Sequence, residues 1–479
     1  MNKIYILLSI LLVGTFSSCS SFLDEQPVSE IPAKEMWQTS RDAKAGVSQI
    51  YSYFRTTMRE NYFYWGEFRS DNMAPGAPSA TNQEKVINNL LTTDHPATKW
   101  TSLYKTISQA NLAIKYIPQI NMPSIAERND LQGQAYAMRA LAYFYAVRVW
   151  GDVPLFLDPV EEYSPSIYRE RTDKQQILKD VILADLKMAE ELIDRTKNKE
   201  RKKISIYGVW AIMADVYMWL GEYNLADQTI TKMGNDPTFM AFEPKIETWR
   251  KMFVEELNFK ASDSTPENDE YTTKEFIFLI HYDMEEVGAN GYSYMYQWFT
   301  GSGNRAAVLS KAYMANFSNE EQDLRKDLTV LNHQNGNELN KFIGGTISTT
   351  LNKTCQVAYP VYRYTDMLLL QAEARARMGK WEEALDLVKK VRDRAGLKTA
   401  TSMDFATEDE IIDYILRERQ IELAGEGRRW FDLVRTGRWK TVMEPISGLY
   451  QDGNELFPIH YSHINENPKL IQNSYYGGK

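Results

Sequence analysis

The stretch from Tyr359 to Trp439 most constrains the fold, because it consists of amphipathic segments separated by single glycines. Apolar residues recur there at a period of 3.6 residues, which predicts a wide buried stripe on a helix. The residues of two adjacent rows are Val361, Tyr364, Leu368, Ala372, Met367, Leu370, Ala374 and Met378. Gly379 then marks a helix end, since glycine adopts the left-handed C-cap conformation without strain. A second helix over 381–395 would complete an antiparallel hairpin.

An earlier part of the chain repeats this arrangement. Helices are expected over 205–220 and 223–233, and their joint carries Gly221 and Tyr223 where the later joint carries Gly379 and Trp381. A turn glycine, an aromatic wedge and small residues at the helix crossing are typical of tetratricopeptide repeats. The sequence therefore predicts an all-α fold, a tetratricopeptide-like scaffold of helix hairpins with long loop-rich insertions and minor β content.

A capping box at Thr407–Glu410 opens what reads as one further helix over 411–439. Glutamates and arginines alternate along it: Glu418, Glu422, Glu426, Arg417, Arg419, Arg428 and Arg429. We interpret them as a ladder of salt bridges on one helix face. Paired carboxylates for acid–base chemistry are the alternative, but neighbouring guanidiniums favour the ionised form of a carboxylate and so disfavour proton transfer.

Ordered short motifs run along both halves of the chain. They are Gln132–Ala135, Trp150–Leu155, Arg363, Leu370–Ala374, Val391–Gly396, Glu418–Leu423 and Asp432–Arg435. This string resembles the SusD/RagB family of outer-membrane lipoproteins. The resemblance implies a bundle of helix pairs whose loop-rich side holds a nutrient, and a SusC-like, TonB-dependent β-barrel transporter as partner. His460 departs from the family pattern, where a proline is expected.

The N-terminus reads as a lipoprotein signal peptide over residues 1–18. Lys3 precedes an apolar run that is too short to span a bilayer, and small residues precede Cys19. A plain secretory signal with an incidental cysteine is the alternative. If Cys19 carries fatty acid (palmitate), the mature chain is anchored rather than spanning. The resemblance adds an outer-membrane location, and the acidic residues after Cys19 are similar to the family's surface-export signal.

Composition excludes several classes of function. The net charge is −9, which argues against nucleic acid as the main partner. The chain has only two cysteines, Cys19 and Cys355, so no disulfide framework is expected. His460 and His463 have a metal-like spacing, but their proline-containing tail offers no further ligand. Without a phosphate loop or a nucleophile motif, we predict no catalytic residues, no metal and no cofactor.

The remaining organisation follows from these elements. We expect a tether over 19–38, an N-terminal helical part over 39–233, an insertion over 234–360 and a C-terminal helical part over 361–479, all in one compact fold. The insertion lacks helical periodicity, although Glu275–Tyr282 reads as a β-strand.

Aromatic clusters on predicted loops are the candidate ligand site. Residues 61–99 interrupt the helical pattern, and Tyr292 to Trp298 alternate so that their rings would share one side of an extended chain. Rings beside carboxylates and amides suit sugars. The candidates are Tyr64, Trp65, Asp71, Asn72, Tyr292, Tyr294, Tyr296 and Trp298. Alternatively, these rings pack the insertion onto the helices.

The sequence thus predicts a non-catalytic surface lipoprotein that binds an oligosaccharide and delivers it to its transporter. Peptide capture by the same fold, as in RagB-like relatives, is the alternative. A secreted glycoside hydrolase would need two carboxylates across a cleft, and no motif marks such a pair. An adaptor for protein tails would leave the signal peptide unexplained.

Overall fold

The computed structural model describes residues 33–77, 80–162, 164–197, 201–236, 242–254, 275–282, 294–299, 305–317, 322–333, 336–342, 357–448 and 451–477. The predicted signal peptide, Cys19, Tyr292 and Cys355 lie outside the described residues. Within them, no helix combines the length and apolar character needed to cross a bilayer.

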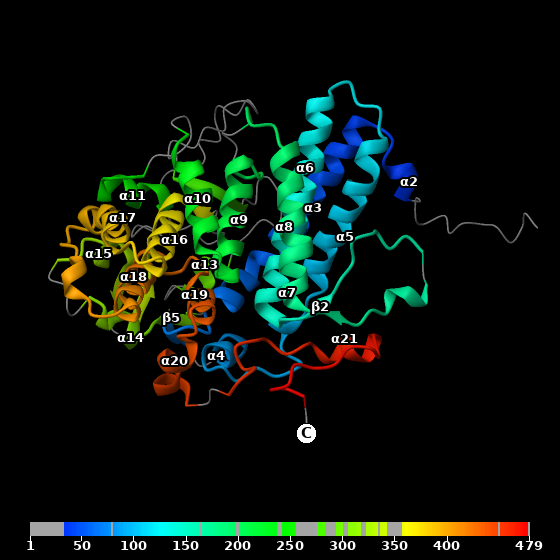
Figure 1. Cartoon of the computed structure of the whole chain (residues 1–479). Coiled ribbons are helices and arrows are strands. Elements are labelled where there is room, and N and C mark those ends of the chain that lie inside the picture. Colours follow the sequence, from blue (N-terminus) through cyan, green and yellow to red (C-terminus); the bar gives the residue numbers. More distant parts are fainter. Residues whose placement is uncertain are drawn as a thin grey trace, which may run out of the picture.

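Long helices build the N-terminal bundle, in which α3 packs against α5, α5 against α6 and α6 against α8 (Figure 1). Its helices are α2 (Ala33–Met36), α3 (Ser40–Gly66), α4 (Thr81–Ile87), α5 (Thr101–Tyr116), α6 (Ile125–Trp150), α7 (Lys174–Gln176) and α8 (Leu183–Leu192). A capping box of Thr39 and Asp42 opens α3. Asp173 caps α7. Because α3 continues to Gly66, the expected break at residue 61 is wrong.

The two predicted hairpins are present and lie side by side. They are α9 (Ile206–Leu220) with α10 (Tyr223–Gly234), and α16 (Tyr364–Arg377) with α17 (Trp381–Arg394). Gly221 has φ of 76° and Gly379 has φ of 74°, the left-handed geometry expected of the joints. Helix α10 packs against α16, and Asp227 accepts hydrogen bonds from Gln371 Nε2 at 2.7 Å and Arg375 Nε at 2.9 Å. Copies far apart in sequence are therefore neighbours in space.

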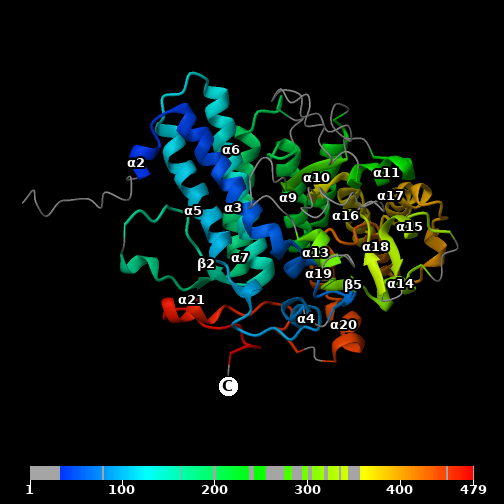
Figure 2. The same cartoon turned by 180° about the vertical axis from the view of Figure 1, so that it is seen from behind.

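The C-terminal helices are shorter than predicted. They are α18 (Glu408–Glu422), α19 (Arg429–Arg435), α20 (Trp439–Ser447) and α21 (Tyr461–Glu466). The capping box at Thr407 is confirmed. The expected single helix over 411–439 is wrong, because Gly425 and Gly427 have φ of 78° and 64° and break it. Figure 2 shows these segments from behind, with α21 beneath the N-terminal bundle and α20 beneath the other half of the molecule.

The strands and the remaining short helices lie mainly in the insertion, although the first three strands belong to the N-terminal helical part. They are β1 (Met73–Pro75), β2 (Val153–Pro154), β3 (Arg171–Thr172), α11 (Ile246–Val254), β4 (Phe276–Tyr282), α13 (Met295–Phe299), β5 (Ala307–Leu309), α14 (Lys311–Ala315), α15 (Lys326–Thr329), β6 (Val330–His333), β7 (Gly336–Leu339) and β8 (Val357–Arg363). The described strands pair in the orders β1-β5-β7-β6, β2-β3 and β4-β8. The predicted strand at Glu275–Tyr282 is confirmed as β4. Its antiparallel partner β8 occupies residues predicted as the start of a helix.

Candidate functional site

The two predicted aromatic clusters meet and form one cluster. Helix α3 carries Tyr64 and α13 carries Trp298, and their ring centroids lie 5.2 Å apart. Phe68 lies 5.5 Å from Trp298, and Phe63 adds an edge contact at 6.0 Å. Because α13 is a helix, Tyr296 and Trp298 do not belong to the extended row of rings that was expected. The cluster instead packs the insertion onto α3, which was the alternative interpretation.

Three of the four predicted ring residues whose side chains are described are buried. Trp65 is completely buried, and its Nε1 donates to the Ala97 carbonyl at 2.9 Å. Tyr64 and Trp298 are 2% and 3% exposed. Burial raises the pKa of Tyr64, and its hydroxyl accepts from Gln83 Nε2 at 2.9 Å. These three side chains therefore support the site from beneath rather than present a surface to ligand.

Asp71 and Asn72 are interior polar residues that join the two ends of the chain. Asp71 forms a bidentate pair with Arg429, through Nε at 2.8 Å and Nη2 at 2.9 Å. Asn72 Nδ2 donates to Glu67 Oε1 at 2.8 Å. The same carboxylate of Glu67 accepts from the backbone N–H groups of Gly425 and Gly427, each at 3.0 Å. The predicted rim role of Asp71 and Asn72 does not fit these buried positions.

Tyr294 is the predicted residue that lies at the edge of the cluster with part of its ring exposed. It stacks on Trp298 with centroids 4.9 Å apart and planes 20° apart. The Arg59 guanidinium lies 5.5 Å from its centroid. Tyr296 belongs to α13, but its side chain lies outside the described set.

A cleft with a volume of about 310 Å³ lies between α3 and β4. Tyr51 and Arg55 line it from α3, residues 278–281 line it from β4, and residues 202–203 complete the lining. The Tyr282 hydroxyl, at the end of β4, donates to the Arg55 carbonyl at 2.8 Å and fixes the strand against the helix. We call the surface formed by Tyr51, Arg55, Arg59 and Tyr294 the α3 face.

The α3 face is cationic although the whole chain is acidic. Arg55 and Arg59 lie four residues apart, one helical turn, and Lys202 and Lys203 line the adjoining cleft. Sequence analysis missed these residues. The sequence signal for this surface was a pair of arginines on the polar side of α3. Such pairs are common on solvated helices, and only the position of Tyr294 in the structure distinguishes this pair.

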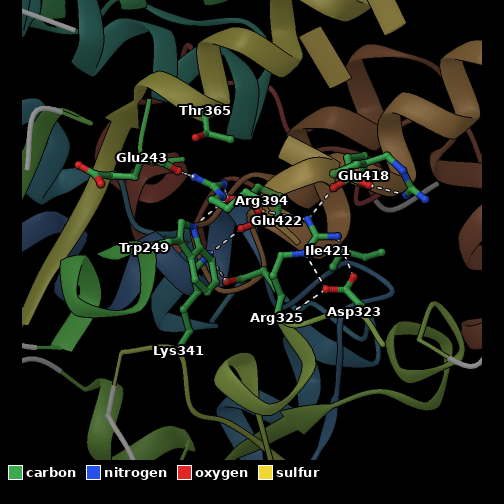
Figure 3. A network of polar contacts seen from close by, with 12 residues as sticks. Glu243, Trp249, Asp323, Arg325, Lys341, Thr365, Arg394, Glu418, Ile421 and Glu422 are labelled. Carbon is green, nitrogen blue, oxygen red and sulfur yellow. Dashed lines mark hydrogen bonds and ion pairs between the residues drawn. The ribbon is translucent and has the colours of Figure 1, made fainter. Parts of the chain in front are cut away.

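The predicted glutamate ladder is a buried ion network, not an exposed helix face (Figure 3). Glu422 contacts Arg363 at 3.0 Å and Arg394 at 2.5 Å. Arg325 contacts Glu422 at 3.1 Å and Glu418 at 2.5 Å. These arginines come from other segments, so the predicted partners within the same helix are wrong. The network fastens the insertion to α18.

The Glu422 carboxylate in this network is held in its ionised form. Burial acts to raise the pKa of Glu422, but Arg394, Arg363 and Arg325 outweigh it and hold that pKa well below its usual value. Burial lowers the pKa of Lys341 to about 8. A carboxylate held ionised by three guanidiniums suits structure better than proton transfer.

His460 and His463 serve the fold. His460 Nδ1 accepts from the Ser462 N–H at 3.1 Å and caps α21. The His463 ring stacks on Trp100 with centroids 5.0 Å apart, and its Nε2 accepts from the Trp100 N–H at 3.3 Å. Across the described part of the chain, no three His, Cys, Asp or Glu side chains are grouped to hold a metal.

Comparisons with known proteins agree over the whole chain. Residues 293–476 match the family described as "SusD family", and residues 21–218 match one described as "Starch-binding associating with outer membrane". SusD-like protein P38 of Formosa agariphila is 32% identical, and the match covers 97% of each chain. SusD-like protein P2 of the same organism is 25% identical over 98% of each chain.

Solved structures show the same fold. B. fragilis NanU superposes with a TM-score of 0.76 at 22% identity, covering 95% of this chain and 100% of NanU. A protein described as "Laminarin binding SusD-like protein" gives a TM-score of 0.73 at 20% identity, covering 92% of this chain and 100% of its own.

Proposed function

The chain belongs to the SusD/RagB family, and we propose that it binds an oligosaccharide at the outer membrane and delivers it, unchanged, to a partner transporter. Support comes from the family descriptions and from the neighbour that binds laminarin. The partner would be a SusC-like, TonB-dependent β-barrel. Fatty acid on Cys19 and the tether over 19–38 would hold the protein at the cell surface.

The position of Tyr294 carries this proposal. Its ring is stacked on buried Trp298, so one face is held rigid before any ligand arrives. Sugars present flat C–H faces to such rings, and the guanidinium of Arg59 supplies donors for hydroxyl oxygens. A preformed platform loses little conformational entropy on binding.

A peptide is the second candidate, and the cationic cleft is what favours it. Arg55, Lys202 and Lys203 would attract a peptide's terminal carboxylate as well as the carboxylate of an acidic sugar. The two ligands differ in their need for a ring platform. Glycan binding should depend on Tyr294, whereas peptide binding should depend mainly on the cations.

The test is a binding screen of the soluble chain that starts after Cys19. The probes are laminarin, starch, xylan and pectin in affinity gels, and a set of tripeptides by calorimetry. We expect retention by at least one polysaccharide, and Tyr294→Ala should weaken it about tenfold, equivalent to about 1.4 kcal/mol. Tyr475→Ala is the matched control, since Tyr475 is half-buried near the C-terminus and does not line the cleft.

Two outcomes would contradict the proposal. Binding of tripeptides without binding of any polysaccharide would favour peptide capture. Release of new reducing ends from a bound polysaccharide would show catalysis. The transporter partnership is tested separately, by isolating the lipidated protein from membranes and asking whether a large β-barrel protein accompanies it in stoichiometric amounts.

A further inference from the structure

A second cleft lies at the start of α5, away from the α3 face. It has a volume of about 410 Å³ and is formed by α5, α21 and the segment between β2 and β3. It shares no lining residue with the cleft between α3 and β4. Figure 2 shows α21 crossing beneath the lower end of α5, whereas α13 lies farther along the molecule.

The floor of this second cleft is aromatic and fixed. Trp100 is held between the His463 ring, 5.0 Å away with planes 11° apart, and the Tyr104 ring, 5.7 Å away. The Tyr104 hydroxyl donates to the Pro154 carbonyl at 2.6 Å. Phe156 stands perpendicular to Tyr104 at 6.2 Å. These contacts set the ring positions in the absence of any ligand.

The rim of the cleft is polar and carries both charges. Lys105 and Ser108 are exposed on α5, and Glu466 is exposed at the end of α21. The His463 Nδ1 lies 4.0 Å from a carboxylate oxygen of Glu466. Burial lowers the pKa of His463 to about 4, so this ring is neutral at pH 7 and leaves the Glu466 carboxylate free to accept hydrogen bonds. Donors and acceptors therefore stand above an apolar floor.

We infer that this second cleft is an additional glycan-binding site that takes a neutral sugar residue of a polymer. The other sugar residues of the polymer occupy the α3 face or stay in solvent. A ring floor with a mixed donor and acceptor rim matches a sugar's C–H face and its hydroxyls. The volume lies within the range of small-molecule pockets, about 300–1,000 Å³. The inference rests on the proposed glycan-binding function.

Two sites on one chain predict a dependence on ligand length. A polysaccharide that engages both sites gains avidity, because the second binding event is intramolecular. A trisaccharide occupies the sites one at a time and gains none. Removing the second site should therefore weaken retention by a polymer and halve the stoichiometry measured with a short oligosaccharide.

The test uses Ser108→Trp, which fills the cleft without removing a core contact, and Tyr168→Ala, which removes a half-buried ring from its wall. Met403→Trp is the matched control, since Met403 is 90% exposed on another part of the surface. The probes are laminarin, starch, xylan and pectin in affinity gels, and laminaritriose, maltotriose, xylotriose and trigalacturonate by calorimetry. Unfolding curves confirm that each variant is folded.

The expected result is a loss of about tenfold in polymer retention for both variants, with two trisaccharide sites in the wild type and one in Ser108→Trp. Wild-type behaviour of both variants, with binding still sensitive to Tyr294→Ala, would overturn the second site and leave the proposed function standing. Failure of the wild-type chain to bind any of these glycans would overturn both.

Discussion

The ion network around Glu422 and the α3 face are built from the same types of residue, but the network stabilises the fold and the α3 face is proposed to bind ligand. In the network, Arg325, Arg363 and Glu422 are fully buried and neutralise one another. On the α3 face, Arg55 and Arg59 are half-exposed beside a ring. Burial with ionic pairing fixes the fold, whereas partial exposure places guanidinium groups where a ligand can reach them. The difference lies in the surroundings rather than in the residue types.

The largest expected effect comes from breaking the network. Glu422→Gln would leave three buried guanidiniums short of a partner, and loss of one member of a buried ion pair costs about 3–5 kcal/mol. The free energy of unfolding, measured with denaturant, should fall by that amount. Glu408→Gln is the control, because its pair with Arg377 is partly exposed. Equal losses of unfolding free energy in both variants would contradict the proposed difference between buried and solvent-exposed ion pairs.

Asp71→Asn tests whether Asp71, which was predicted to bind ligand, instead stabilises the fold as the buried ion pairs do. It breaks the bidentate pair with Arg429 and should cost about 3 kcal/mol of stability. Affinity of the folded protein for a glycan should stay unchanged, because Asp71 does not reach the α3 face. A selective loss of glycan affinity at unchanged stability would return Asp71 to the ligand site.

Glu67 should give a smaller effect that depends on pH. Burial raises its pKa from 4.5 to about 7, although Asn72 and two backbone N–H groups oppose this. The folded chain therefore keeps a proton that the unfolded chain releases. Glu67 contributes stability that is complete below pH 4.5 and is lost as pH rises through 7, on the order of 2–3 kcal/mol.

That contribution is measured as the difference in unfolding free energy between the wild type and Glu67→Gln, at about pH 5 and about pH 8. The difference should shrink as pH rises. Parallel pH profiles for the two proteins would show that the folded chain does not hold this proton.

The smallest expected effect on stability comes from the α3 face. Arg55→Ala removes a half-exposed side chain and should change unfolding free energy by no more than about 0.5 kcal/mol. Glycan retention should nevertheless fall about tenfold, because a charged donor to the ligand is lost. Arg41→Ala, an exposed arginine at the start of α3, should change neither quantity. A large stability loss in Arg55→Ala would place Arg55 with the buried network.

Local signals predicted much of the fold. The joints at Gly221 and Gly379, the capping box at Thr407 and strand β4 each depend on a few neighbouring residues, so the sequence displays them directly. The expectation failed at 359–363 because this segment pairs with β4 as a strand, and a distant partner overrides local periodicity.

The candidate site was harder to predict for the same reason. Tyr64 and Trp298 were recognised as ring-bearing residues, but each buries the other, and no spacing within either segment reveals that contact. The partners of Glu422 come from the insertion and from α17, which a helix-face argument does not include. Tyr294 was one of the predicted candidates, but its position at the edge of the cluster is visible only once its neighbours are placed.

The links from Asp71 to Arg429 and from Glu67 to Gly427 have a consequence for biogenesis. During synthesis, α3 is made long before Arg429 and Gly427, which later pair with the polar residues at its end. Until the C-terminal residues are synthesised, the carboxylates of Glu67 and Asp71 lack these partners and the aromatic rings near them are uncovered. The interior of the protein therefore closes only when its last helices have been synthesised.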